Sequence, residues 1–257
     1  TMALLDTNAA DLRITTYDTA TGPAAAASRA IADGNKLILG PLMGDDVGVV
    51  ASVARPAKVP IIAFSNDARV AGRDIFIMGA PPSESIVRTV SFARDKGMTR
   101  FAALIPDGEY GLRAAAAMNN AVEDAGGTLV ATENYARGNT SVVSAARRLK
   151  LKGNFDAVLI ADGGRIASLA AQQLKSPGGA GPRLLGTELW NGDSVAATSP
   201  ALRGAWYASV SDARFRQFSE SYRGRFGTQP YRIATLGYDS VLLTLRVARG
   251  WKPGTIF

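Results

Sequence analysis

The sequence contains no cysteine and no histidine. Without cysteine, disulfide bonds, thiolate metal ligands and a cysteine nucleophile are excluded. Without histidine, an imidazole metal site and a Ser-His-Asp triad are excluded as well. Catalysis by this chain would need a pair of carboxylates, or a metal held by oxygen ligands. We therefore expect no enzyme, no cofactor and no bound metal.

The sequence also lacks an apolar run close to the roughly 20 residues that a membrane-spanning helix needs. No signal peptide is recognisable, and the opening residues TMALLD read as the end of a helix. We expect a chain trimmed at both ends, so the missing signal says nothing about export. A lipid anchor preceding Thr1 stays open for the same reason.

The formal net charge is +7, which suits partners such as nucleic acid, anionic lipid or an anionic cell-wall polymer. The basic residues are scattered, however, and their densest cluster is RRLKLK at 147–152. That cluster reads as the solvated end of a helix, where cations suit the helix dipole. We therefore expect no nucleic-acid partner.

Apolar, strand-like runs alternate with helical patterns along most of the chain. Continuous apolar strands are typical of parallel sheets whose two faces are both covered by helices. The predicted strands are 12–18, 36–40, 59–65, 100–107, 128–136, 155–162, 182–187 and 204–210. The predicted helices are 22–34, 45–58, 82–97, 109–127, 140–150, 164–175, 213–227 and 232–250.

These units are too many for one open sheet, so we predict an α/β fold with two Rossmann-like lobes. A helix ends at Gly97 and a second series of strands and helices follows it, which places the first boundary there. The chain is expected to return to the first lobe near residue 210. Lobe I then consists of residues 1–97 and 211–257, and lobe II of residues 98–210.

Glycine-containing turns follow the predicted strands. In open parallel sheets, ligands bind beyond the carboxyl ends of the strands, and glycine lets a ligand approach backbone N–H groups. A helix that begins there favours an anion. The alternative is that these glycines only close tight turns. The turns are 39–46, 64–67, 106–111, 161–164 and 186–193, and none matches a P-loop or a dinucleotide-binding glycine pattern.

Acidic and aromatic side chains in these turns are candidate ligand contacts. Glu188 and Trp190 directly follow a predicted strand, and an acid beside an aromatic ring suits a cationic group. Tyr110 has a ring to cover a ligand and a hydroxyl to bind it. The alternatives are a surface salt bridge for Glu188 and ordinary packing for Tyr110. For an enzyme, the carboxylate pairs to test would be Asp107 with Glu109 and Asp162 with Glu188.

The order of these motifs resembles that of type I periplasmic binding proteins of the leucine/isoleucine/valine-receptor kind. The resemblance rests on LILGPLMGDDVGVVASVA, VPIIAFS, IPDGEYGLRAAAAMNNAVEDAGGTLV, FDAVLIADGG and LLGTELW, which together extend over nearly the whole chain. The segments IADGGR and LLGTELW are similar to the branch called penicillin-binding protein activators, which share the fold of the C-terminal domain of the lipoprotein LpoA. Either resemblance implies two lobes that close on a cleft.

The resemblance also assigns contacts to individual positions. It implies that Glu188 holds the α-ammonium of an amino acid and that Tyr110 lines the cleft. Gly44 stands where amino-acid receptors have a serine, so only backbone donors remain there. The turn at Asp162 replaces a cleft tyrosine, which disfavours a free amino acid. The complete predicted set is Met43, Gly44, Ser65, Asn66, Tyr110, Asp162, Gly163, Glu188 and Trp190.

The function implied is that of a non-enzymatic, extracytoplasmic protein that holds a small polar, amino-acid-like ligand between two lobes. Its partner would be an ABC permease, and its location the periplasm after removal of a signal peptide. The alternative is an activator of a penicillin-binding peptidoglycan synthase with a modified or vestigial cleft. A peptidoglycan fragment would then be the ligand, and the synthase the partner.

Overall fold

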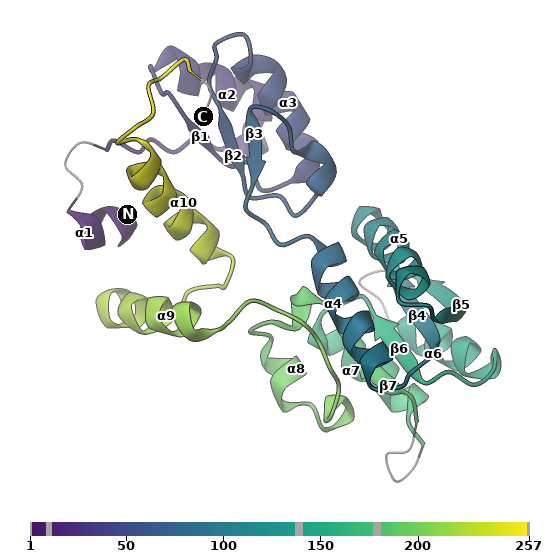
Figure 1. The fold of residues 1–257 in the computed structure, drawn as a ribbon. Coiled ribbons are helices and arrows are strands. Elements are labelled where there is room, and N and C mark those ends of the chain that lie inside the picture. Colours follow the sequence, from purple (N-terminus) through teal and green to yellow (C-terminus); the bar gives the residue numbers. More distant parts are fainter. Residues whose placement is uncertain (1, 9–11, 137–140, 177–180, 256–257) are drawn as a thin grey trace. The chain divides into compact units, whose positions relative to one another are not determined.

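The computed structural model describes residues 2–8, 12–136, 141–176 and 181–255, and divides the chain into two compact units. Unit 1 comprises Thr1–Pro81 and Ser211–Phe257, and unit 2 comprises Pro82–Val210. Each unit has a parallel sheet with helices packed on it (Figure 1). The predicted α/β class with parallel sheets covered by helices is thus confirmed.

Unit 1 has a three-stranded parallel sheet in the order β1-β2-β3. β2 is buried along its whole length, whereas both residues of β1 are only half-buried. The strands are β1 (Ile38–Leu39), β2 (Ile61–Ala63) and β3 (Ile75–Ile77). The helices are α1 (Met2–Thr7), α2 (Pro23–Ala32), α3 (Gly44–Ala54), α9 (Ala213–Phe226) and α10 (Ala234–Val247), with short 3₁₀ turns at Thr19–Thr21 and Ala68–Val70.

Unit 2 has a four-stranded parallel sheet in the order β5-β4-β6-β7. The strands are β4 (Arg100–Pro106), β5 (Thr128–Tyr135), β6 (Ala157–Ile160) and β7 (Arg183–Leu185). The helices are α4 (Pro82–Asp95), α5 (Glu109–Asp124), α6 (Ser141–Leu151), α7 (Gly164–Leu174) and α8 (Ser194–Thr198), with 3₁₀ turns at Glu188–Trp190 and Pro200–Leu202.

The sheet of unit 2 has a hydrophobic core on each face. Alternate residues of one strand point to opposite faces, so Phe101 and Ala103 pack with α4 and α5, while Ala102 and Leu104 pack with α6 and α7. All four of these residues are at most 1% exposed. This two-sided burial explains why the strands read as continuous apolar runs.

The structure differs from the sequence prediction at one boundary between the units. Residues 82–97, predicted in lobe I, belong to unit 2, because the apolar face of α4 packs on α5 and the sheet of that unit. The other boundary lies between Val210 and Ser211. Pro81 and Pro82 stand at the first boundary, where a helix begins rather than where it ends.

Two predicted strands are absent from the described residues. Residues 12–18 form no strand and pair with none among the described residues, and residues 204–210 make only a single bridge, between Trp206 and Leu185. β3 was not predicted, because its apolar run, IFIM, is only four residues long. Among the described residues, no helix combines the length and apolar character needed to cross a bilayer.

Candidate functional site

The predicted site residues are divided between the two units. Met43, Gly44, Ser65 and Asn66 belong to unit 1, whereas Tyr110, Asp162, Gly163, Glu188 and Trp190 belong to unit 2. Each set lies at or just beyond the carboxyl end of a strand, as the sequence pattern predicts. We call each set the half-site of its own unit.

The half-site of unit 1 brings together the turns after β1 and β2. Met43 is the N-cap residue of α3 and is 62% exposed, and its side chain makes no capping hydrogen bond. A Cβ atom added at Gly44 would lie 3.3 Å from the Ser65 hydroxyl, so the two turns are in close contact. The Ser65 hydroxyl is buried and accepts a hydrogen bond of 3.0 Å from the Asp67 N–H.

The carboxylate of Asp67 is a buried neighbour that was not among the predicted site residues. It is ion-paired with Arg69 at 2.7 Å and accepts the Arg69 backbone N–H at 3.0 Å. Because Asp67 caps the 3₁₀ turn at Ala68–Val70, its role is to hold the turn that contains Ser65 and Asn66. The motif FSND carried a signal for this role, since Asp before a short helical turn is a common cap.

The half-site of unit 2 joins the beginning of α5 to the end of β7. The Tyr110 hydroxyl lies 2.9 Å from the Thr187 hydroxyl and 3.0 Å from Oε1 of Glu188. These residues are almost 80 positions apart in sequence but meet because both follow strands of one parallel sheet. Thr187 is completely buried, and its hydroxyl also accepts the Leu189 N–H.

Glu188 is half-buried, and its two carboxylate oxygens differ. Oε1 is bonded to Tyr110, whereas Oε2 is buried and has no hydrogen-bond partner among the described residues. Burial raises the pKa of this carboxyl above its usual range, while the Tyr110 hydroxyl and the positive charge of Arg113 lower it in part. A buried carboxylate oxygen without a donor is costly, and a cationic donor would relieve that cost.

The turn Asp162-Gly163-Gly164 differs from what the sequence predicted. Its backbone N–H groups were expected to face a ligand, but both are bound by carboxylates of this chain. Gly163 donates to Asp162 Oδ1 at 2.8 Å, and Gly164 donates to Asp193 Oδ2 at 2.8 Å. Asp162 Oδ2 accepts the Tyr135 hydroxyl at 3.1 Å. Asp193 thus takes the place at the N-terminus of α7 that was predicted for a ligand anion.

Trp190 was predicted to lie at a cleft edge, but the structure buries it within unit 2. Its side chain is 2% exposed, packs in the core beside α7, and donates its indole N–H to the Asp162 carbonyl at 2.7 Å. A Cβ atom at Gly186 would lie 2.3 Å from the indole ring, so the ring stacks directly on that backbone. The aromatic face is therefore used in packing within unit 2 and is not open to a cation.

The structure offers no support for the carboxylate pairs considered for catalysis. Asp107 and Glu109 are both exposed at the turn before α5, and Asp162 is held by Tyr135 and by its neighbouring amide. Within the described ranges, no group of three or more acidic side chains is placed to hold a metal ion.

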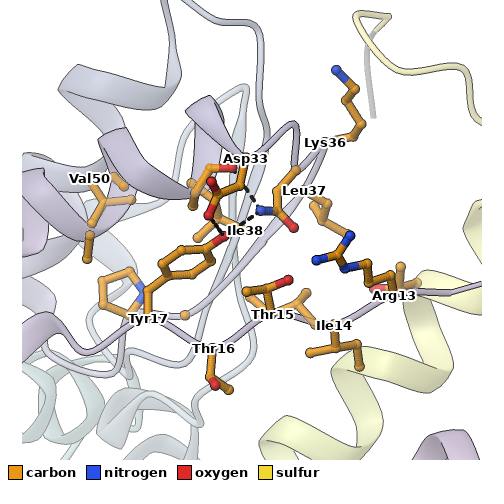
Figure 2. A pocket seen from close by; sticks show the side chains of 18 of the residues that line it. Arg13, Ile14, Thr15, Thr16, Tyr17, Asp33, Lys36, Leu37, Ile38 and Val50 are labelled. Carbon is orange, nitrogen blue, oxygen red and sulfur yellow. Dashed lines mark hydrogen bonds between the residues drawn. The ribbon is translucent and has the colours of Figure 1, made fainter.

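Unit 1 contains a groove of about 610 Å³ that none of the predicted residues lines. Figure 2 shows its walls, which are formed by residues 12–17 and by residues 36–41 before the Met43 turn. A volume of this size is in the range of ligand-binding pockets.

Comparison with known proteins identifies the class. A family model described as periplasmic binding protein matches residues 3–255, and the chain belongs to this family. Its fold is similar to that of a solute-binding protein of an ABC transporter from Rhodopseudomonas palustris in complex with 3,4-dihydroxybenzoic acid. That comparison gives a TM-score of 0.74 and 19% identity, and covers 98% of this chain and 76% of the other.

Two further proteins are similar to this chain. One is the branched-chain amino acid transporter substrate-binding protein LivJ from Streptococcus pneumoniae in complex with isoleucine, with a TM-score of 0.68, 19% identity, and coverage of 98% of this chain and 78% of the other. The other is the uncharacterized protein RP748 of Rickettsia prowazekii, 27% identical over 150 residues. The matched part is 58% of this chain but only 40% of that relative. The resemblance to periplasmic binding proteins is confirmed, and the resemblance to the activator branch stays a prediction.

Proposed function

We propose that this protein is an extracytoplasmic solute-binding protein for a small amino-acid-like ligand, and that it delivers the ligand to an ABC permease. Membership of the periplasmic binding protein family supports the class and the location. The observation that supports the ligand chemistry is the half-buried carboxylate of Glu188. One of its oxygens is bonded to Tyr110, and the other has no donor among the described residues.

An ammonium group fits this carboxylate. An N⁺–H donor on Oε2 would form a charge-assisted hydrogen bond, and its charge would stabilise the ionised form against the burial that raises the pKa of Glu188. A carboxylate-only ligand, such as the dihydroxybenzoate bound by the Rhodopseudomonas palustris protein, would instead be repelled by Glu188. The isoleucine bound by LivJ carries the ammonium that Glu188 favours.

We propose the turns Met43-Gly44 and Ser65-Asn66 of unit 1 as the second half-site. The α3 N-terminus has no side-chain cap, and the Ser65 hydroxyl proton has no acceptor among the described residues, so both offer donors. Asp45 and Asp46 lie in the same first turn and oppose an anion there. The unit 1 contacts therefore suit a polar group of the ligand better than a strongly bound carboxylate.

Ligand screening by thermal shift, followed by calorimetry, tests the proposal. The panel contains the amino acids, 3,4-dihydroxybenzoate and muropeptides. A ligand present at about 100 times its Kd should stabilise the protein by roughly 2.7 kcal/mol. The variant Glu188→Gln should lose most of the binding, because it keeps the shape but removes the charge that holds the ammonium.

The matched control is Glu123→Gln, the same change at an exposed position of α5. It should bind the ligand as tightly as the parent protein. Equal binding by Glu188→Gln would refute the ammonium assignment. Binding of the aromatic acid alone would refute the amino-acid-like ligand, and binding of muropeptides alone would favour the cell-wall alternative.

A further inference from the structure

The 3₁₀ turn after β7 carries two buried acceptor oxygens that lack a donor. They are Oε2 of Glu188 and Oδ1 of Asn191, and neither has a hydrogen-bond partner among the residues that the structure describes. A buried acceptor without a donor costs free energy, because folding removes its water without replacing the hydrogen bond. Asn191 was not among the predicted site residues, yet its amide oxygen is in the same position as the Glu188 carboxylate oxygen.

The backbone of the turn places these two side chains on one side. The Trp190 N–H donates to the Thr187 carbonyl at 3.1 Å. The Asn191 N–H donates to the Glu188 carbonyl at 3.0 Å, which completes the 3₁₀ pattern. In such a turn, side chains three residues apart are eclipsed, and their Cα atoms are about 6 Å apart. Glu188 and Asn191 therefore project from the same side of the turn.

The two residues between them occupy the other sides. Trp190 packs in the core beside α7, and Leu189 packs against the cores on both faces of the sheet. The third side of the turn is left to the two polar residues. On that side the Tyr110 hydroxyl is bonded to Oε1 of Glu188 at 3.0 Å, so Oε2 is the carboxylate oxygen that still needs a donor.

The amide of Asn191 is oriented by its nitrogen. Nδ2 donates to the Val210 carbonyl at 3.5 Å, which is a long hydrogen bond. A carbonyl oxygen accepts and does not donate, so the amide atom that faces it is the nitrogen. The atom that remains without a partner is therefore an acceptor, as it is in Glu188.

We propose that Oδ1 of Asn191 is a second acceptor for the cationic nitrogen of the ligand, beside Oε2 of Glu188. This inference rests on the proposed function, in which Glu188 binds an ammonium group. One ammonium nitrogen bridges two oxygens that lie about 4.5–5 Å apart, because each hydrogen bond is about 2.8 Å long and the N–H groups diverge tetrahedrally. The carboxylate attracts the charge, and the neutral amide adds a requirement for a second N–H group.

The pair of acceptors defines which cations the site accepts. Primary and secondary ammonium groups have at least two N–H groups and satisfy both oxygens. A tertiary ammonium has one N–H group and a quaternary ammonium has none, so they leave one or both oxygens buried without a donor. Sites with buried polar groups reject ligands that leave those groups unpaired. We therefore infer that Asn191 is a specificity-determining residue that excludes tertiary and quaternary amines.

The test uses glycine, N-methylglycine, N,N-dimethylglycine and N,N,N-trimethylglycine. All four carry one carboxylate and one positive charge, and they offer three, two, one and no N–H groups. None has a side chain, so the series makes no demand on the rest of the pocket. NMR titration of the backbone amides of residues 187–193 measures each Kd. For the parent protein, the affinity should fall at least tenfold between N-methylglycine and N,N-dimethylglycine.

The variant Asn191→Leu keeps the shape of the side chain and removes the acceptor. The step between N-methylglycine and N,N-dimethylglycine should shrink to less than threefold in this variant, while the bulk of the added methyl group is the same in both proteins. The matched control is Asn120→Leu, the same change at an exposed position of α5, and it should keep the tenfold step.

The outcomes separate this inference from the proposed function. Equal affinity of the parent protein for N-methylglycine and N,N-dimethylglycine would overturn the inference, even if Asn191→Leu does not fold. A tenfold step that persists in Asn191→Leu would overturn it as well, because another group would then be the second acceptor. So would absence of binding of all four compounds, and binding of another amino acid would still support the proposed function. Undiminished binding by Glu188→Gln would overturn both.

Discussion

The adjacent glycines Gly163 and Gly164 should respond very differently to the same substitution. A Cβ atom at Gly163 would lie 3.5 Å from Asp193 Oδ2, an ordinary contact, and its φ of −65° suits any residue. A Cβ atom at Gly164 would lie 2.4 Å from the Ala196 backbone nitrogen and 2.6 Å from Asp193 Oδ1. The backbone at Gly164 cannot take a side chain unless the beginning of α8 moves.

The magnitudes follow from these contacts. Gly163→Ala restricts the unfolded chain, worth about 0.4–1 kcal/mol, but alanine is a poorer N-cap than glycine by a similar amount. Its net effect should be within about 0.5 kcal/mol of zero. Gly164→Ala combines overpacking, about 1–3 kcal/mol, with weakening of hydrogen bonds to a charged group, about 1.5–3 kcal/mol. After a gain in helix propensity of about 1 kcal/mol, we expect a loss of about 1.5–5 kcal/mol.

The bonds at risk are those of Asp193. Its carboxylate accepts Gly164 N–H at 2.8 Å, Val195 N–H at 2.8 Å and Ala196 N–H at 3.0 Å, and so joins the N-termini of α7 and α8. Moving α8 away from Gly164 disturbs all three. The expected destabilisation is therefore a property of the link between the two helices, not of α7 alone.

Urea denaturation followed by tryptophan fluorescence measures the difference, because Trp190 is buried beside this turn and donates to the Asp162 carbonyl. The free energies of unfolding of the two variants are compared for the transition in which the tryptophan fluorescence changes. Free energies of unfolding within about 0.5 kcal/mol of each other would refute the reasoning. They would mean that the second glycine is not packed against Asp193, and that the turn is open to a ligand after all.

Three further predictions concern the charged groups of unit 2. Glu188→Gln should raise the free energy of unfolding at neutral pH without ligand, because burial raises the pKa of Glu188 and so disfavours its ionised form. In the parent protein, this contribution to stability is fully present below the unfolded pKa of about 4.3 and is lost as pH rises through the folded pKa. Urea titrations of the variant should lack that loss. Tyr110→Phe removes a hydrogen bond that lowers the pKa of Glu188, so in NMR titrations the Glu188 midpoint should move to higher pH, and an unchanged or lower midpoint would contradict the assigned bond. Asp156→Asn should be less stable than the parent protein at pH 7 but not in strong acid, because the backbone N–H groups of Thr99 and Arg100 hold the pKa of Asp156 below its usual range. The stability advantage of the parent protein is present above a pH of about 4 and is lost as pH falls through the folded pKa of Asp156. Equal stability of the two proteins in urea at pH 7 would refute this prediction.

Much of the fold can be predicted from the sequence because burial on both faces of a sheet leaves a clear pattern. β4 and β6 are continuous apolar runs, and α5 begins directly after a glycine turn, so their positions follow from periodicity and turn residues. β3 lies in an apolar run of only four residues, IFIM, which is too short to distinguish it from a loop. The alternation at 12–18 fits a strand, but no described neighbour pairs with it, and pairing depends on contacts that a local pattern does not contain.

The candidate site, like the fold, could be predicted from the sequence only in part. The rule that ligand sites follow strand ends correctly brings Tyr110 and Glu188 to one edge of a sheet, where they share a hydrogen bond. It fails at Gly163, because the pattern NGDS around Asp193 indicates a cap for α8 but not that the same carboxylate reaches α7, 29 residues earlier. It fails at Trp190 as well, since whether a ring packs inward or outward is decided by the tertiary neighbours.

Unit 2 is continuous in sequence and unit 1 is not, and this difference affects the order in which the units are completed during synthesis. Unit 2 is a single stretch, Pro82–Val210, whereas unit 1 combines the first 81 residues with Ser211–Phe257. During synthesis, unit 2 has all of its sequence available once Val210 has left the ribosome. Unit 1 has all of its sequence only after Ser211–Phe257 has emerged, so the unit that is begun first is the last to be completed.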